Sequence, residues 1–179
     1  HSWMPKDTLL LAEYQTKGRG QRQRSWVAPF ASSVLLSYKK TFDKTYSLDG
    51  FSVLVGQCLQ QTLLRHYPSL SLHCKWPNDI YCQGKKLAGI LVESTTMGEV
   101  QTVVVGVGLN VVYPVDNHPF WISLEVALGK SLRREEVALL VANSVEMSFV
   151  SYNLKVSSII TIKTAAFLYD RSRIWEFIT

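Results

Sequence analysis

The sequence predicts an α+β fold in which helices pack against a mixed, mainly antiparallel sheet. Two stretches carry apolar residues at the spacing of a buried helix face, and several short apolar runs have the character of strands. The intervals between these runs are short, whereas a parallel crossover needs about a dozen residues or more. Helices stacked against such a sheet form a two-layer sandwich.

The first part of the chain provides two strands, a polar loop and a helix. Residues 8–14 and 33–38 are apolar runs of strand character, and 16–25 is a polar, glycine-containing loop without apolar periodicity. A four-residue apolar repeat predicts a helix over 48–66, with Ser47 as its N-cap. The expected buried face of this helix comprises Phe51, Val55, Leu59 and Leu63.

Four further strands and a second helix follow. Turn signals at Gln83-Gly84 and Met97-Gly98 separate the strands, so we expect antiparallel neighbours. The helix is predicted over 133–152, with Ser131 as its cap. The strands are expected over 70–76, 80–82, 87–93 and 102–112, and short elements over 165–169 and 174–178. The buried stripe of the second helix comprises Val137, Leu140, Val141, Val145 and Phe149.

The composition is that of an ordinary globular protein. The chain has 179 residues, of which 47% are hydrophobic and 18% charged, so we expect one well-buried domain and no extensive disorder. No apolar run reaches the ~18–20 residues that cross a bilayer, and the N-terminus does not resemble a secretory signal. The first residue is not Met, so we expect that residues are missing from the front end.

Cysteines, histidines and charge exclude some classes of function. Three cysteines without a CxxC pair argue against a disulfide framework and suit a reducing compartment, and the four histidines lack paired metal-ligand spacing. The net charge is +5, with a local excess at 17–24. That excess suits nucleic acid, an acidic protein partner or a phosphorylated small molecule, and charge alone does not choose among them.

The loop at 18–24, with the sequence GRGQRQR, is the first candidate site. Its two glycines let backbone N–H groups approach a ligand, and its three arginines supply charge and bidentate donors. The alternative is a solvated surface loop. It is not a Walker A motif, because no Gly-Lys-Ser/Thr follows.

A second candidate site combines Asn78-Asp79 with Lys86. The polar pair interrupts an apolar stretch, where it needs hydrogen-bond partners or a ligand, and an Asx-type turn is the alternative. Lys86 begins an apolar strand, and in a low dielectric its ammonium would hold an anion strongly. A snorkelling surface lysine is the alternative. Ala88 and Gly89 would allow a flat ligand to approach the backbone.

Glycines in an apolar strand are the third candidate. Residues 105–111 read VGVGLNV, and glycines within a buried strand cost stability unless something passes close by. A β-bulge is one interpretation, and a ligand packed on the strand is the other.

Taken in order, these segments resemble the biotin protein ligases. The loop around 18–20, with Arg24 and Trp26, resembles the adenylate-binding loop of that family, and Lys75-Trp76-Pro77-Asn78-Asp79 its most diagnostic pentapeptide. Residues 86–93 and 106–110 resemble the two segments that follow. The resemblance implies a biotin–lipoate ligase-like catalytic domain, similar to class II aminoacyl-tRNA synthetases, over 1–160. Residues 161–179 would then start a truncated small C-terminal β-domain.

The resemblance implies a two-step reaction. Biotin and ATP, with Mg²⁺, would form biotinyl-5′-adenylate, and a lysine of a biotin carboxyl carrier domain would then take the biotin. It implies catalytic roles for Lys86 and Arg19, and it places Asn78, Asp79 and Asn110 near the nucleotide and Mg²⁺, without a dedicated metal site. The biotin- and adenylate-binding residues would be Gln15, Gly18, Arg19, Gly20, Gln21, Arg24, Trp26, Lys86, Gly89, Gly106 and Gly108.

The chain departs from the family pattern in several places. Gln21 and Gln23 stand where many members have Arg and Gly, so Arg22 or Arg24 would have to replace that anion contact. The family's Ser-Thr-Asn segment and any DNA-binding helix-turn-helix are absent from these residues. We therefore expect a truncated, monofunctional, cytoplasmic ligase that does not bind DNA or membranes, with a homodimer as an open alternative to the monomer.

Three other functions remain open from the sequence. One is a degenerate family member that binds biotin without turnover, which Gln21 and the missing front segment would suit. A lipoate or octanoate ligase shares the fold and the acyl-adenylate chemistry. A nucleic-acid-binding module would use the basic loop, but it leaves Lys86, Asn78-Asp79 and the glycine strand unexplained.

Overall fold

A single antiparallel sheet organises the chain. The structure, a computed structural model, describes residues 7–112 and 118–152. The described residues form a six-stranded sheet in the order β1-β2-β6-β5-β4-β3, in which every neighbouring pair of strands is antiparallel. The strands are β1 (Thr8–Ala12), β2 (Ser33–Phe42), β3 (Leu72–Lys75), β4 (Asp79–Cys82), β5 (Lys85–Met97) and β6 (Val100–Asn110). The predicted antiparallel α+β fold is confirmed.

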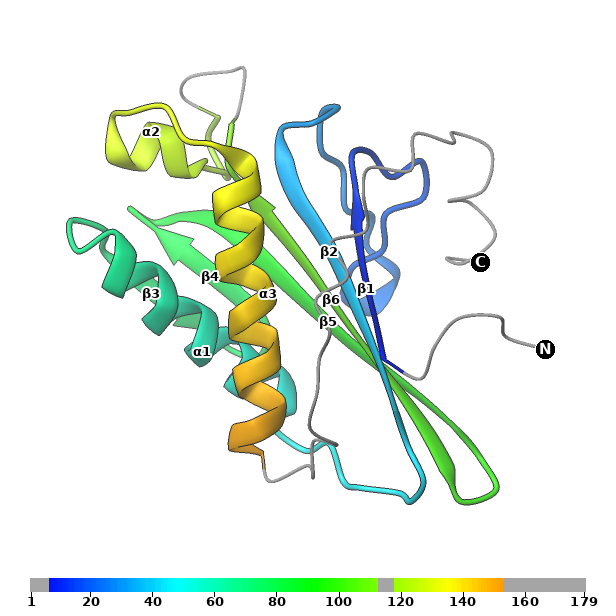
Figure 1. Cartoon of the computed structure of the whole chain (residues 1–179). Helices are drawn as coiled ribbons and strands as arrows, with labels where there is room; N and C mark the ends of the chain where they lie inside the picture. The colour runs from blue at the N-terminus through cyan, green and yellow to red at the C-terminus, as the bar shows by residue number, and fades with distance from the viewer. Residues whose placement is uncertain (1–6, 113–117, 153–179) are drawn as a thin grey trace.

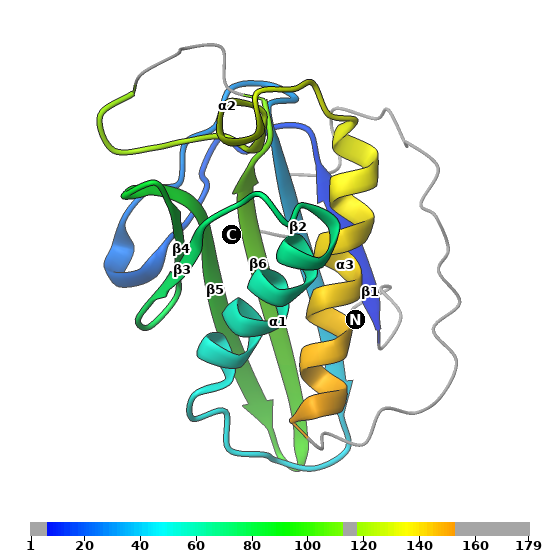
Figure 2. The ribbon, with the colours of Figure 1, turned by 90° about the vertical axis from the view of Figure 1, so that its left-hand side faces the viewer.

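Two long helices lie side by side on one face of this sheet (Figures 1 and 2). They are α1 (Phe51–His66) and α3 (Arg134–Ser151). A short helix, α2 (Leu124–Leu128), precedes α3, and a 3₁₀ turn, η1 (Gln21–Gln23), lies in the polar loop. That loop lies on the opposite side of the sheet from the two long helices (Figure 1).

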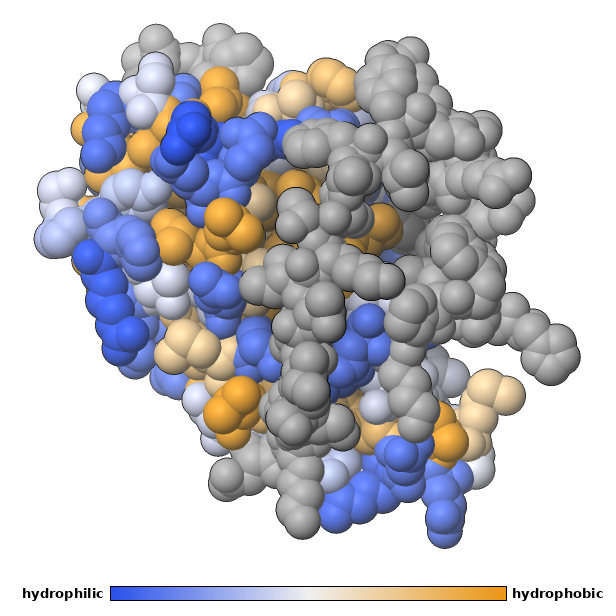
Figure 3. Space-filling model, in the orientation of Figure 1, coloured by the Kyte–Doolittle hydropathy of each residue, from blue (hydrophilic) through white to orange (hydrophobic). Residues whose placement is uncertain are grey.

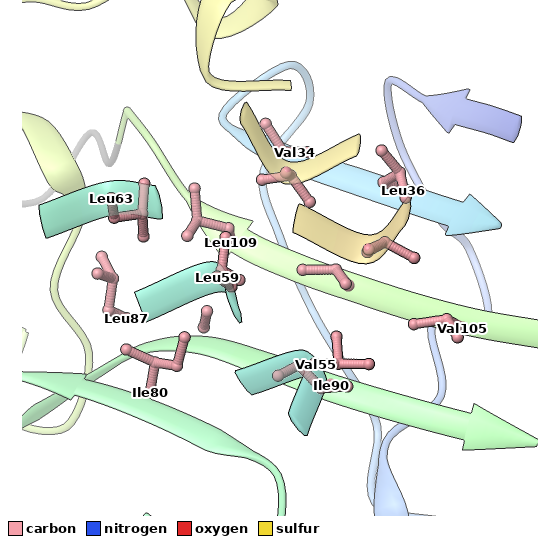
Figure 4. Close-up of a cluster of buried hydrophobic side chains, with 14 of the residues drawn as sticks. Val34, Leu36, Val55, Leu59, Leu63, Ile80, Leu87, Ile90, Val105 and Leu109 are labelled. Atoms are coloured by element: carbon pink, nitrogen blue, oxygen red, sulfur yellow. The ribbon is translucent and has the colours of Figure 1, made fainter. Parts of the chain in front are cut away.

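The core lies between the long helices and the sheet. Side chains from α1 and from strands β2, β4, β5 and β6 point toward one another there (Figure 4). The four-residue repeat of α1 is confirmed, because all four predicted residues have no exposed surface. In α3 the predicted stripe is buried except for Leu140, which is partly exposed. Burial of an aliphatic or aromatic side chain contributes about 1.5–3 kcal/mol, so this interface dominates the stability of the fold.

Both predicted helix caps are wrong. The N-cap of α1 is Gly50, whose φ of 76° is left-handed, and Ser47 instead exchanges hydrogen bonds with Asp49. Glycine takes this conformation at little cost, so the chain can turn into the helix without a capping side chain. The N-cap of α3 is Arg133, which makes no side-chain cap bond, and not Ser131.

Helix α2 was not predicted from the sequence. Its N-cap is Ser123, whose side chain accepts a hydrogen bond from Val126 N, and it ends at Gly129 with a φ of 64°. Strands β2 and β5 also run beyond their predicted ends, at Phe42 and Met97. The predicted boundary at residue 160 and the elements at 165–169 and 174–178 lie outside the described residues.

Apolar side chains also reach the surface on the outer side of α3. Leu139, Met147 and Val150 are 55%, 45% and 57% exposed. Figure 3 shows orange patches among hydrophilic side chains on the face where this helix lies. Within the described ranges, no helix is both long and apolar enough to span a membrane.

Candidate anion-binding site

One row of register partners crosses all six strands on the face opposite the helices. Register partners point to the same side of a sheet. Leu36, Ile90 and Leu109, which neighbour members of the row along the chain, lie in the core beneath the helices, so the row itself faces away from them. We call this side the site face. From edge to edge the row consists of Ala12, Leu35, Gly108, Gly89, Asp79 and Lys75.

Lys86 and Asp79 form an ion pair on the site face. Lys86 Nζ lies 2.7 Å from Asp79 Oδ1, and the side chains are only 24% and 20% exposed. A β-bulge between Ile80 and Tyr81 shifts the register of β4 against β5. The Lys86 side chain runs forward along β5 over Gly89, where an added Cβ would lie 3.3 Å from Nζ. The cation is therefore held at a defined point, and the surface-lysine interpretation is wrong.

The indole ring of Trp26 covers the two glycines of the row. A Cβ on Gly108 would lie 2.5 Å from Trp26 Cε2, and one on Gly89 would lie 3.0 Å from Trp26 Cζ3. The ring also lies 5.5 Å from Lys86 Nζ, within cation–π range. Trp26 packs with a small second cluster of Ala12, Ala28 and Leu35. Loop, glycine strand and lysine thus meet at one side chain.

The glycine–arginine loop is folded back on itself. Trp26 N donates to Gly18 O at 2.8 Å, and Gly20 N donates to Arg24 O at 2.7 Å. Arg22 has a left-handed φ of 55° in the 3₁₀ turn between them. A cavity of about 760 Å³ lies between this loop and β5. Its lining includes Gly18, Arg19, Gly20, Gln21, Arg22, Arg24, Leu91 and Glu93.

Arg19 reaches across this cavity to Glu93. Its Nη2 donates to Glu93 Oε2 at 2.9 Å, and the two side chains are 55% and 43% exposed. Glu93 was not singled out from the sequence, because a lone acidic residue at the end of an apolar run carries no signal. It is the carboxylate that lines the cavity beside the four basic residues Lys17, Arg19, Arg22 and Arg24.

Two predicted nucleotide-proximal residues bond to the protein backbone. Asn78 Nδ2 donates to Ile90 O at 3.0 Å. Asn110 is buried, and its amide accepts from Ser33 Oγ and donates to Ile122 O, both at 3.3 Å. Both asparagines therefore tie strands and loops together, and their proximity to a nucleotide stays a prediction.

The remaining predicted residues lie around the same face. The side-chain oxygen of Gln15, Oε1, would be 3.0 Å from a Cβ on Gly18, so this side chain packs against the loop. Gln21 and Arg24 line the cavity. Gly106 pairs with Leu91 and with Ser37, two residues along the strands from the row and on the same face. A Cβ there would meet only Leu91 atoms at 3.7 and 3.8 Å.

One neighbouring segment was missed by sequence reasoning. Lys86 N donates to Phe120 O at 2.8 Å, and Ile122 N donates to Lys86 O at 3.0 Å, so the chain around 120–122 pairs in parallel with the start of β5. The rings of His118 and Trp121 stack with centroids 4.2 Å apart. An aromatic cluster after the glycine strand was the available signal.

These groups form a candidate anion-binding site on the face of the sheet opposite the two long helices. Arginines on a folded loop line the cavity beside β5, and Lys86 is held on the same face of that strand, over Gly89. In the described part of the chain, three or more His, Cys, Asp or Glu side chains nowhere gather as a metal site.

Comparison with known proteins identifies the class. Residues 1–110 match the family described as the biotin/lipoate A/B protein ligase family, so the chain belongs to that family. The bifunctional ligase/repressor BirA of Escherichia coli is 37% identical over 135 residues, which cover 72% of this chain and 41% of BirA. A biotin–[acetyl-CoA-carboxylase] ligase of Paracoccus denitrificans is 37% identical over 113 residues, covering 56% and 43%.

A solved structure has the same fold. The biotin protein ligase of Aquifex aeolicus, in complex with biotin and ATP, superimposes with a TM-score of 0.70 at 26% identity. The match covers 86% of this chain and 66% of the Aquifex chain. The chain spans less than half of the length of the two relatives compared by sequence.

Proposed function

We propose that this chain carries the adenylate-forming part of a biotin protein ligase. The observation that carries the proposal is the position of Lys86, whose ammonium lies over Gly89 on β5, the strand that also lines the arginine-bearing cavity through Leu91 and Glu93. Family membership and the likeness to a ligase that binds biotin and ATP support the same reaction.

In the first step, a carboxylate oxygen of biotin would attack the α-phosphorus of ATP. A new P–O bond forms, the bond to the β-phosphate bridge breaks, and pyrophosphate leaves with the electron pair. Two anions must approach each other, so positive groups that face the developing charge lower the barrier. Lys86 would contact the biotin carboxylate and the α-phosphate, and Arg19 the phosphate oxygens.

In the second step, the amine of a lysine on a biotin carboxyl carrier domain would attack the carbonyl of the mixed anhydride. An amide bond forms, AMP leaves as the anion, and the amine gives up its proton to solvent. No covalent bond to the enzyme is involved, so the reaction needs no nucleophilic cysteine or serine. The names of relatives as biotin–[acetyl-CoA-carboxylase] ligases support a carboxylase subunit as the acceptor.

Mg²⁺ would enter as the complex with ATP and offset the charge of the triphosphate. The two carboxylates on the site face are both ion-paired, Asp79 with Lys86 and Glu93 with Arg19. This pairing fits an ion brought by the nucleotide better than one held permanently by the protein. We also retain Gln15, Gly18, Gly20, Gln21 and Arg24 as proposed contacts of biotin and the adenylate.

The loop would protect the intermediate. Biotinyl-adenylate is an activated anhydride that water hydrolyses, and a loop closed over it excludes water. The loop already lies over β5 and is tied to it through Arg19 and Glu93, which supports this role.

A lipoate ligase is the second candidate, because the description of the matched family covers both activities. ATP–pyrophosphate exchange of the full-length protein, measured with biotin and with lipoate separately, distinguishes the two. We expect exchange with biotin, and exchange with lipoate alone would overturn the biotin proposal.

The catalytic role of Lys86 is tested in the same assay. Lys86→Ala should lower the exchange rate by about 10²–10³-fold, as the loss of one charge-stabilising donor does. Lys85→Ala removes the neighbouring charge and should leave the rate within about twofold of wild type. Equal rates for Lys86→Ala and wild type would contradict the mechanism. Sedimentation of the same protein with and without biotin and ATP tests whether it pairs as a homodimer.

A further inference from the structure

Two facing glycines of the sheet provide the seat for one indole ring. Gly89 and Gly108 are register partners on β5 and β6. A Cβ on Gly108 would lie 2.5, 2.6 and 2.9 Å from three Trp26 ring atoms, and one on Gly89 would lie 3.0 Å from a fourth. Real Cβ atoms do not approach rings this closely, so a side chain at Gly108 would displace the indole.

A neighbouring glycine on the same strand lacks this constraint. Gly106 lies two residues before Gly108 and therefore points to the same face. A Cβ on Gly106 would meet Leu91 at 3.7 and 3.8 Å, which is ordinary van der Waals contact. The close approach is thus a property of the glycines beneath Trp26 and not of the glycine strand as a whole.

Packing, and not a hydrogen bond, holds the Trp26 ring in place. Its Nε1 is buried and has no hydrogen-bond partner in the described part of the chain. The ring packs on the two glycines and on Ala12, Ala28 and Leu35. Its orientation therefore depends on the flat surface that the glycines leave.

The same ring lies beside Lys86. Lys86 Nζ is 5.5 Å from the ring centroid and 2.7 Å from Asp79 Oδ1. A Cβ on Gly89 would lie 3.3 Å from both Cε and Nζ of Lys86. The end of the lysine thus occupies the space between the indole ring, the carboxylate and the bare backbone of Gly89.

We propose that Trp26 is a positioning residue for Lys86, and that Gly89 and Gly108 are required to seat its ring. The glycines then have a role toward the protein's own side chain, in addition to the ligand contacts that the resemblance implies. The effect on catalysis rests on the proposed adenylation function. The seating of the ring does not.

A thermal denaturation cycle tests the seating without any ligand. Gly108→Ala should lower Tm by about 3–10 °C, as overpacking does in a chain of this size. Gly106→Ala is the matched control and should change Tm by less than about 2 °C. In a Trp26→Ala background, Gly108→Ala should cause no further loss. Equal effects of the two glycine substitutions, or a full loss in the Trp26→Ala background, would overturn the seating.

Chemical modification tests the positioning of Lys86 independently of activity. An acetylating reagent is added, and acetylation of Lys86 is followed by mass spectrometry, with Lys85 as internal control. Trp26→Leu should raise the rate at Lys86 at least threefold relative to Lys85, because the amine loses one wall. Trp26→Phe keeps a flat ring and should stay within about twofold of wild type. Unchanged rates in Trp26→Leu would overturn the positioning role.

Kinetics then connect the position to the reaction. Trp26→Leu should lower kcat of biotin-dependent exchange about tenfold, with Trp26→Phe restoring most of it, because a displaced cation no longer faces the transition state. A change confined to KM for biotin would show that Trp26 acts as a wall of the biotin pocket, and it would overturn the positioning role. If wild type shows no exchange, the proposed function fails, and the denaturation and acetylation results still decide the structural proposal.

Discussion

Lys86 and Asp79 meet at 2.7 Å on the site face, although Asp79 is the register partner of Gly89 and not of Lys86. The lysine side chain runs forward along β5, over Gly89, to reach the carboxylate. It can do so because Gly89 has no side chain in the way. The pair therefore joins the pentapeptide at 75–79 to the strand that follows it, and it sets where positive charge is presented.

We expect this ion pair to contribute a measurable coupling energy. Both side chains are mostly buried, so solvent screens the pair less than an exposed one, and a coupling of about 1 kcal/mol is expected. Urea unfolding of wild type, Asp79→Asn, Lys86→Met and the double variant measures it. A coupling below about 0.3 kcal/mol would show that the two groups are close but energetically independent.

The Arg19–Glu93 pair should compete with anions for the arginine. Because the pair is exposed, it stabilises the fold by less than about 1 kcal/mol, and Glu93→Gln should change Tm by at most about 2–4 °C. Removal of the carboxylate frees Arg19, so the affinity for inorganic pyrophosphate should rise about threefold at low salt. Calorimetric titration measures it. Glu99→Gln, at an exposed position in the β5–β6 turn, is the control, and equal affinities in the two variants would contradict the competition.

Part of the site could be predicted from the sequence. Gly98 and Glu99 form the two-residue turn between β5 and β6, and the turn signal at Met97-Gly98 thus fixes the pairing of Gly89 with Gly108. The apolar repeat of α1 likewise identified its buried face, because burial on one side of a helix requires that spacing.

Other relationships depend on contacts that no local pattern encodes. The bulge after Ile80 brings Asp79, not its neighbour, opposite Gly89, and a one-residue shift would have reversed the faces. The position of Trp26 over the glycine strand depends on the packing of a loop that is remote in sequence. Gly50 starts α1 through a left-handed backbone that needs no capping side chain, so Ser47 is not the cap that the sequence predicts.

Alkaline pH should destabilise the fold partly through Tyr38. Burial, and then its hydrogen bond to Glu146 at 2.6 Å, raises the pKa of Tyr38 far above the ordinary value near 10. The native state thus keeps a proton that the unfolded state loses above about pH 10, so stability is full below that pH and falls as pH rises. One such proton contributes up to about 1.4 kcal/mol per pH unit.

Urea unfolding from pH 8 to 11 measures this effect. Tyr38→Phe should be less stable than wild type at pH 8 and should lose stability less steeply above pH 10. Tyr14→Phe removes the hydroxyl of a side chain that is 44% exposed and serves as the control. Parallel curves for wild type and Tyr38→Phe would show that another group causes the alkaline loss.

Phe149 should be a main contributor to the core. It is fully buried, and its ring lies 4.9 Å from that of Phe51 and 5.5 Å from that of Tyr38. Phe149→Ala should cost about 3–5 kcal/mol, because it removes buried surface and leaves a cavity between the two long helices and the sheet. Met147→Ala, on the exposed side of the same helix, should cost less than about 1 kcal/mol. Urea unfolding measures the free energy of unfolding of both variants. Similar losses would show that α3 does not bury the face that carries Phe149.

The two glycines of the loop should differ sharply in their tolerance of a side chain. A Cβ on Gly18 would lie 2.3 Å from the backbone oxygen of Trp26, whereas one on Gly20 would lie 3.2 Å from the backbone oxygen of Arg24. The first contact requires the backbone to move and breaks the bond from Trp26 N to Gly18 O, while the second needs a shift of a few tenths of an ångström. Gly18→Ala should therefore open the loop, and Gly20→Ala should preserve it.

Limited trypsin digestion measures this difference at the bond after Arg22, which is exposed and carries a left-handed backbone. In wild type and Gly20→Ala, biotin with ATP should slow cleavage at this bond at least fivefold, because the adenylate holds the loop closed. In Gly18→Ala, cleavage should be fast in both conditions. Cleavage that is equally fast with and without ligands in wild type would contradict loop closure over the adenylate. Equal protection in both variants would show that the Gly18 contact is not what shapes the loop.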